Sequence, residues 1–275
     1  MFHLTFDLEL HDPIKKLDII PKEQFFIEQE ITLKKIFSFI NKNDIKISCF
    51  VTNDFVKEYY DFFHYYIVNH HEIGAHTADH LFYNGTNKVD FIKSIKKNKT
   101  LLEKETGCKC QGFRAPGGVV PKDIISILKK LNFKYDTSLL PGIMIGRYNY
   151  SHRRKHPYFP SYNNIFISDR KNKEIIEFPL LTSKYLNMSM NGIFFSFYNI
   201  FINRYYHDKL CSVLYLHPSD FKKIGLFEKS FFWDKIKWTK RYWSFLKDYV
   251  TINKNRDVSL FATYLDLISN IAENE

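Results

Sequence analysis

The stretch EIGAHTADH (residues 72–80) places two histidines, His76 and His80, directly after a short apolar segment. Residues 72–76 are expected to form a strand that ends at the first histidine. The H-x-x-x-H spacing is that of zinc sites in which one helical turn carries two imidazoles on the same side. Chance pairing is an alternative, because the chain contains 11 histidines. The surrounding elements must therefore decide between a metal site and an incidental pair.

On both sides of this stretch, expected strands alternate with expected helices. This order is typical of βαβ units, which require a parallel sheet. We expect one α/β domain over residues 1–275, a distorted (β/α) barrel of about seven parallel strands. Strands are expected at 2–8, 45–52, 72–76, 110–116, 134–140, 174–181, 211–217 and 258–263. Helices are expected at 26–41, 54–70, 89–107, 121–133, 194–210 and 235–253, with a last one from Asp266.

The alternation is interrupted around residues 141–173, where Gly, Asn, Ser, Arg and His are frequent. We interpret this part as a loop insertion. Its segment GRYNYSHRRKHPYFP (146–160) is basic and aromatic. Arg153 and Arg154 could bind a phosphate while Tyr158 stacks on a sugar. A solvated charged loop without a binding role is equally compatible with this composition.

The composition limits the possible partners and the cellular location. The net charge of +10 favours an anionic partner such as a phosphate, a membrane surface or a nucleic acid. Lysines scattered over the expected helices, without a binding motif, argue against nucleic acid. Four cysteines are too few for a disulfide scaffold, so reduced thiols are expected. No secretory signal or transmembrane run is visible, which predicts a cytoplasmic protein. Peripheral contact with the inner face of the membrane through the aromatic helix 194–206 is an alternative.

Polar residues gather where the expected strands end. In an α/β barrel these ends form the rim that holds the active site. Each residue alone could be a helix cap or a surface group, but six titratable groups on one rim favour a catalytic centre. They are Asp7 and Glu9, His76, Arg114, Asp136 and His217. A carboxylate from the first strand would complete a set of two histidines and one carboxylate with His76 and His80. Such a set leaves a coordination position open for water, as catalytic metal sites do.

Five segments resemble, in order, the motifs of the polysaccharide deacetylase family with its NodB-homology domain. They are TFDLE (5–9), HTADH (76–80), RAPGG (114–118), YDTS (135–138) and LYLHP (214–218). The segment VSLFATYLDLI (258–268) is similar to the last strand and helix of that domain. The resemblance implies a distorted (β/α) barrel, a divalent metal that is usually zinc, and hydrolysis of an N-acetyl group on an amino sugar.

The resemblance also implies roles for individual residues. His76 and His80 match the metal ligands, and Asp7 matches the general base. Arg114 matches the residue that orients this base. His217 matches the general acid, and Asp136 matches the carboxylate that holds His217 and raises its pKa. The backbone N–H of Gly117 would face the oxyanion.

The first motif departs from the family's common pattern, in which a second aspartate follows the first and binds the metal. Leu8 stands at that position. Alternate residues of a strand point to the same side, so Asp7 and Glu9 can share a face. We therefore expect Glu9 to be the third ligand. Asp7 could bind the metal instead, which would leave the identity of the base open.

The expected substrate is an N-acetylated or N-formylated amino sugar, linked to a nucleotide or to polyprenyl phosphate. This would place the reaction in surface-polysaccharide or lipopolysaccharide biosynthesis. A deacylase of a non-sugar amide is one alternative. A non-catalytic carbohydrate-binding relative is another. Leu8 favours that alternative, whereas the intact Asp7, Arg114 and His217 argue against it.

Overall fold

The computed structural model describes residues 2–10, 22–141, 154–169, 171–181, 212–221 and 238–272. The expected helix at 194–210, with the membrane contact inferred from it, lies outside these ranges. So do Arg153 and Cys211.

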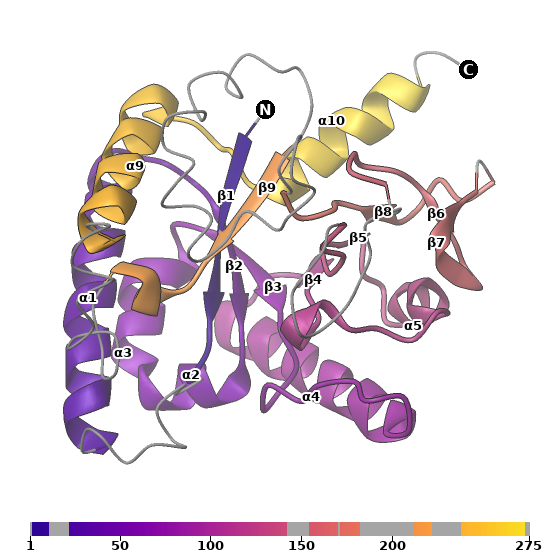
Figure 1. Ribbon diagram of the computed structural model, residues 1–275, viewed down its shortest axis with the longest axis horizontal. Coiled ribbons are helices and arrows are strands. Elements are labelled where there is room, and N and C mark those ends of the chain that lie inside the picture. Colours follow the sequence, from indigo (N-terminus) through magenta and orange to yellow (C-terminus); the bar gives the residue numbers. More distant parts are fainter. Residues whose placement is uncertain are drawn as a thin grey trace.

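Seven parallel strands form one sheet in the order β8-β5-β4-β3-β2-β1-β9. The strands are β1 (Phe2–Leu8), β2 (Ser48–Val51), β3 (Glu72–Ala75), β4 (Gly112–Phe113), β5 (Tyr135–Asp136), β8 (Ile176–Glu177) and β9 (Ser212–Leu216). The sheet curls (Figure 1). An isolated parallel bridge between Leu180 and Val213 joins the chain beyond β8 to β9. This arrangement confirms the expected α/β fold, a distorted (β/α) barrel of the NodB type.

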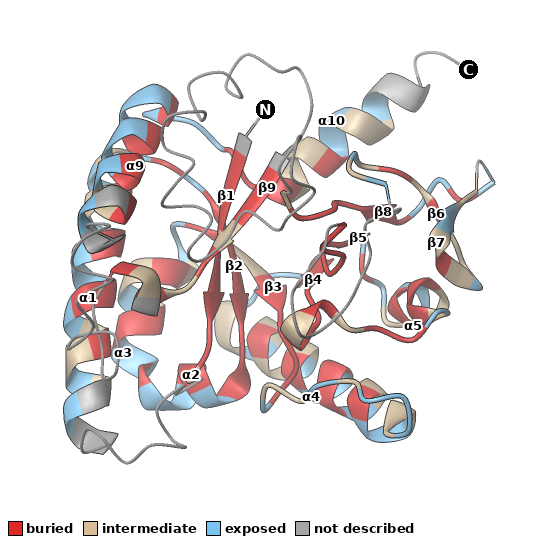
Figure 2. Cartoon of the chain, viewed as in Figure 1, coloured by how far each residue is buried: buried red, intermediate tan, exposed pale blue. Residues whose placement is uncertain are grey.

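Helices cover the outside of the curled sheet (Figure 1). The longer ones are α1 (Lys22–Lys42), α4 (Lys88–Thr106), α5 (Ile124–Lys130), α9 (Trp238–Asn253) and α10 (Leu260–Ala272). Short helical segments are α2 (Asn53–Glu58), α3 (Tyr60–Phe62), the π-helix η1 (Phe63–Val68) and the 3-10 turns η2 (Pro116–Gly118) and η3 (Pro218–Phe221). The strands are buried and the helices expose their outer faces (Figure 2). The core therefore lies between the helices and the sheet.

The strand expected at 258–263 is wrong, because helix α10 begins at Leu260. The hydroxyl of Ser259 accepts a hydrogen bond from the backbone N–H of Ala262 at 3.4 Å, as an N-cap residue does. Leu260 and Tyr264, one helical turn apart, are buried against the sheet cluster that contains Phe50. A helical period of apolar residues thus replaces the expected strand.

The expected insertion at 141–173 contains an antiparallel hairpin of β6 (Pro160–Ser161) and β7 (Asn164–Ser168). Tyr158 forms an antiparallel bridge with Glu177, which attaches the hairpin to β8. Part of the expected loop is therefore an extension of the sheet edge.

In the ranges that the structure describes, no helix combines the length and apolar character needed to cross a bilayer. Cys49, Cys108 and Cys110 are free thiols, as expected.

Candidate active site

Glu9, His76 and His80 meet at the carboxyl end of the sheet. Their potential ligand atoms all lie within 4.8 Å of one another. Oε2 of Glu9 is 3.4 Å from Nε2 of His76 and is also in contact with Nε2 of His80. Glu9 follows β1 directly and His76 follows β3, so the ends of two strands on either side of β2 supply two of the three residues. The structure thus brings together the three residues expected to bind a metal.

The imidazole of His76 is oriented by a backbone carbonyl. Its Nδ1 lies 2.8 Å from the carbonyl oxygen of Arg114, and the ring is buried. A carbonyl only accepts hydrogen bonds, so Nδ1 carries the proton. Nε2 therefore faces Glu9, and in the neutral imidazole it is the nitrogen that can bind a metal. A carbonyl partner of this kind fixes the tautomer of many metal-binding histidines.

The segment between the two histidines is a loop and not the helical turn that their spacing suggested. Thr77 and His80 have positive φ angles of 59° and 54°. Two side chains of α4 hold this loop. The hydroxyl of Ser94 accepts from the N–H of Ala78 at 2.9 Å, and Oδ1 of Asn98 accepts from the N–H of His76 at 2.8 Å. Ser94 and Asn98 were not predicted from the sequence, although polar residues four apart on the buried face of a helix are a usable signal.

The donor set of Glu9, His76 and His80 fits a divalent metal. Oε2 of Glu9 is buried, faces both Nε2 atoms and accepts no hydrogen bond of regular geometry. Burial alone would raise the pKa of Glu9, but His76, His80 and the nearby His217 hold it well below its ordinary value. The carboxylate is therefore in the charged form that a cation requires. Two imidazole nitrogens and one carboxylate oxygen are typical of zinc in catalytic sites.

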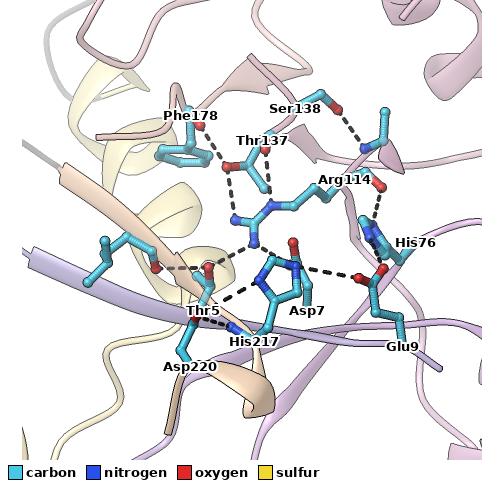
Figure 3. A network of polar contacts seen from close by, with 12 residues as sticks. Thr5, Asp7, Glu9, His76, Arg114, Thr137, Ser138, Phe178, His217 and Asp220 are labelled. Atoms are coloured by element: carbon cyan, nitrogen blue, oxygen red, sulfur yellow. Dashed lines mark hydrogen bonds and ion pairs between the residues drawn. The ribbon is translucent and has the colours of Figure 1, made fainter. Parts of the chain in front are cut away.

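Asp7 is held beside this cluster by Arg114. Nη1 of Arg114 lies 2.6 Å from Oδ1 of Asp7 and also donates to Oγ1 of Thr5 at 2.9 Å. The Nε of Arg114 donates to the carbonyl of Thr137 at 3.2 Å (Figure 3). The guanidinium carbon lies 4.1 Å from the centroid of the Phe50 ring. The guanidinium is thus fixed on several sides, and it fixes one carboxylate oxygen of Asp7.

Leu8, between the two carboxylates, is fully buried in the core. Asp7 and Glu9 both line the cavity at the rim of the barrel. The alternation expected for the first motif is therefore present.

His217 has a different carboxylate neighbour from the one expected. Among the described residues, Asp136 interacts with Ser138 and Glu177. Instead, Oδ2 of Asp220 accepts from the backbone N–H of His217 at 2.8 Å and lies 3.9 Å from its Nδ1 (Figure 3). Asp220 is close because the 3-10 turn η3 follows His217 and folds the chain back within three residues. Nε2 of His217 lies 3.5 Å from Oε1 of Glu9, at the metal cluster.

Asp136 faces the interior of the sheet. Its Oδ1 accepts from the hydroxyl of Ser138 at 2.6 Å, and it lies opposite Glu177 in the register of β5 and β8. Both carboxyl groups are buried. Glu177 was not predicted as a site residue, and its signal in the sequence is a single acidic residue inside the apolar run 175–180.

A cavity of about 240 Å³ opens between these groups. Gly117 lies on its wall with a φ of 65°, a conformation that favours glycine, and a Cβ there would come within 2.7 Å of the Phe82 ring. Phe82 packs edge-on against His80 with ring centroids 4.8 Å apart. The wall consists of Asp7, Glu9, His76, His80, Phe82, Arg114, Ala115, Gly117, Gly118, Ser138, Leu140, Leu180, Tyr215 and His217.

Two of the expected substrate-binding residues do not line this cavity. The hydroxyl of Tyr158 donates to the carbonyl of Ile165 at 2.6 Å, and the side chain is buried in the hairpin. The guanidinium carbon of Arg154 lies 5.7 Å from the centroid of the Tyr158 ring. Both residues thus belong to the outer edge of the sheet.

Comparisons with known proteins agree with this fold. The sequence profile of the polysaccharide deacetylase family matches residues 18–135, which contain HTADH and RAPGG. No curated protein sequence matches the chain significantly.

Three solved structures have similar folds. A Mycobacterium smegmatis protein assigned as a polysaccharide deacetylase has 14% identity and a TM-score of 0.67, covering 98% of this chain and 90% of its own. A Pseudomonas aeruginosa PAO1 protein with the same assignment has 10% identity and a TM-score of 0.62, covering 98% and 89%. PuuE allantoinase has 12% identity and a TM-score of 0.56, covering 88% and 84%. At these identities the structures establish the fold alone, and the profile match adds that residues 18–135 are similar to the polysaccharide deacetylase family.

Proposed function

We propose that this chain is a metal-dependent hydrolase that removes an N-acetyl or N-formyl group from an amino sugar. The observation that carries the proposal is the meeting of three groups in one cavity. These are the cluster of Glu9, His76 and His80, the Asp7–Arg114 ion pair and His217. The similarity of residues 18–135 to the polysaccharide deacetylase family supports a carbohydrate deacetylase, and the cavity supplies the groups that hydrolysis of an amide requires.

Glu9, His76 and His80 would hold the metal, with zinc the expected ion. When bound, zinc lowers the pKa of a coordinated water toward about 7 and polarises a carbonyl. Asp7 acts as the general base that accepts a proton from the attacking water. Arg114 keeps Asp7 in place, because it binds one carboxylate oxygen and is itself fixed by Thr5.

His217 acts as the general acid. An amine leaves poorly from a tetrahedral carbon unless it is protonated, so a second proton-transfer group is needed. Asp220 holds the backbone of His217 and lies near its Nδ1, which orients Nε2 toward the cavity. The backbone N–H of Gly117, on the cavity wall, is proposed to donate to the developing oxyanion.

The test combines metal analysis of the purified protein with deacetylation assays on N-acetyl sugars. We expect about one zinc-like ion per chain and release of acetate. His76→Ala and His80→Ala should each remove both metal and activity. His70→Ala is the matched control, because His70 is exposed and lies outside the cluster. Full metal content in a His76→Ala/His80→Ala double variant would contradict the site, and turnover of only ureides or other non-sugar amides would redirect the substrate class.

The proposal has three further parts. The substrate is linked to a phosphate carrier, the reaction belongs to surface-polysaccharide or lipopolysaccharide biosynthesis, and the protein acts in the cytoplasm. The net charge of +10 supports an anionic substrate. A free N-acetyl sugar, a nucleotide-linked N-acetyl sugar and a chitin oligomer should be compared at equal concentration. The nucleotide-linked sugar should have the highest kcat/KM. A higher kcat/KM for the neutral oligomer would reject the proposal that the substrate is linked to a phosphate carrier.

A further inference from the structure

Two buried carboxyl groups lie side by side next to the candidate active site. Asp136 on β5 pairs with Glu177 on β8 in the parallel register, and both side chains have 0% exposure. Neither belongs to the metal cluster or to the proton-transfer groups proposed above. Carboxylates buried at this depth require compensation by hydrogen bonds, a cation or a proton.

Each carboxyl group has one oxygen with a donor and one without. Oδ1 of Asp136 accepts from the hydroxyl of Ser138 at 2.6 Å, and Oε1 of Glu177 accepts from the N–H of Leu139 at 3.0 Å. Oδ2 of Asp136 and Oε2 of Glu177 are buried without a hydrogen-bond donor. One proton shared between the carboxyls would provide the missing donor.

The surroundings do not stabilise two negative charges at this position. Burial raises the pKa of Asp136 and of Glu177, and the charge of Asp136 raises that of Glu177 further. Arg114, which directly follows β4, is a cation whose charge acts on both carboxyls. Arg114 is already paired with Asp7 at 2.6 Å. A single proton would leave one negative charge on the carboxyl pair.

The same two carboxyls support the loops that line the cavity. The hydroxyl of Ser138, which donates to Asp136, accepts from the N–H of Ala115 at 2.8 Å and so ties the RAPGG loop to the end of β5 (Figure 3). Leu139, which donates to Glu177, also accepts from the N–H of Leu180 at 2.8 Å. Ser138, Ala115 and Leu180 are all on the cavity wall.

The RAPGG loop and the segment 138–140 are closely packed against each other. A Cβ on Gly118 would lie 2.8 Å from the carbonyl oxygen of Ser138 and 2.5 Å from Leu140. A shift of the 138–140 segment would therefore move the RAPGG loop and its Gly117 as well.

We propose that Asp136 and Glu177 share one proton and, as a pair, position the two loops that form the cavity wall. Both are positioning residues, since they act through Ser138 and Leu139. The catalytic part rests on the proposed function, whereas the shared proton is measured through stability and needs no substrate.

The shared proton is tested by the pH dependence of thermal unfolding. In the unfolded chain, both carboxyls lose their protons above about pH 4–4.5. In the folded chain the pair keeps one proton, so above this pH the folded chain binds more protons than the unfolded chain. Stability from this pair therefore falls as pH rises above that value. Glu177→Gln keeps an acceptor for Leu139 and supplies a permanent donor to Asp136. Between pH 5 and 9, the Tm of this variant should decrease less than the Tm of the wild type. The difference between the two decreases should be about 2–4 °C for each unit of pKa shift that the substitution removes.

Glu174→Gln is the matched control, because Glu174 is an exposed carboxylate near β8 that pairs with Lys129 at 2.8 Å. It should keep the wild-type dependence of Tm on pH. Equal pH dependence in the wild type and Glu177→Gln would overturn the shared proton. Asp136→Asn provides a second reading, since it also replaces the proton by a fixed amide donor.

The positioning role is tested by rescue of activity. Glu177→Ala leaves both Asp136 and the N–H of Leu139 without a partner, and kcat/KM should fall about 10-fold or more. Glu177→Gln should restore kcat/KM to within about 3-fold of the wild type at neutral pH. If Glu177→Ala keeps wild-type kcat/KM, the pair does not position the wall. If Glu177→Ala fails to fold, the positioning role stands only if Glu177→Gln keeps wild-type KM and kcat, and loss of either would reject it.

Discussion

Glu9 and Glu177 are both glutamates at the carboxyl end of a parallel strand, and both are buried, with exposures of 5% and 0%. Their surroundings are opposite. Glu9 faces the imidazoles of His76, His80 and His217, and its pKa lies well below the ordinary value. Glu177 faces the carboxyl of Asp136, and its pKa lies well above it. Burial alone would raise the pKa of both, so the partners decide which glutamate carries a charge.

The difference assigns separate tasks to two parts of one rim. The β1–β3 side presents a charged carboxylate with imidazoles, which is a ligand set for a cation. The β5–β8 side presents two carboxyls that need a shared proton, and this pair supports the wall of the cavity. Replacing a carboxylate by an amide should therefore weaken metal binding on the β1–β3 side and should be tolerated on the β5–β8 side.

The largest effect is expected for Glu9→Gln. A neutral amide is a poorer ligand than a carboxylate, so the metal should be lost or weakly held. Because the ion supplies several kcal/mol to the transition state, kcat/KM should fall roughly 10⁴-fold. Metal content and turnover measured on the same preparation check this, with Glu177→Gln as the partner variant that keeps its metal. Full metal binding in Glu9→Gln would remove the contrast between the two glutamates.

Asp7→Asn is expected to keep the metal and to lower kcat about 10³-fold, within the range for loss of a general base. Arg114 would still hold the amide oxygen, so the geometry should persist. Metal analysis together with kcat separates this residue from Glu9. Loss of metal in Asp7→Asn with retention in Glu9→Gln would show that the two carboxylates have exchanged roles.

A smaller effect is expected at the general acid. His217→Ala should lower kcat about 10²-fold and Asp220→Asn about 10-fold, with the double variant close to His217→Ala alone. Asp136→Asn combined with His217→Ala should instead give losses that multiply. Kinetics of the single and double variants distinguish the two aspartates. Non-additivity between Asp136 and His217, with multiplying losses for Asp220, would restore the pairing expected from the sequence.

The sequence alone predicted the half of the site that depends on strand ends. Parallel strands end at one edge of a barrel, so Asp7, Glu9, His76 and Arg114 could be grouped without coordinates. The period of two along a strand also placed Leu8 in the core. Local rules of this kind require only the expected elements and their order.

The other half of the site depends on tertiary contacts that the order of elements along the sequence does not predict. Glu177 meets Asp136 only because β8 joins the sheet beside β5. Asp220 reaches His217 only because η3 turns back on itself, and Asn98 reaches the HTADH loop only because α4 packs beneath β3. At 258–263, a short apolar run was compatible with both a strand and a helix, and the cap at Ser259 decided for the helix.

The smallest effect is expected at Tyr158, which supports the carboxyl-pair side from outside. Its backbone exchanges hydrogen bonds with Glu177 at 3.2 and 2.9 Å, and its hydroxyl donates to Ile165 at 2.6 Å. Tyr158→Phe removes only the hydroxyl, so the free energy of unfolding should fall by about 1 kcal/mol, or somewhat more because a buried carbonyl loses its donor. Activity should not change, because the ring does not line the cavity. Denaturant unfolding and kcat/KM check both points, with Tyr162→Phe as a control whose hydroxyl receives an exposed bond from Lys129. A loss of kcat/KM in Tyr158→Phe without a loss of stability would return Tyr158 to substrate binding, and it would extend the candidate site beyond the described cavity.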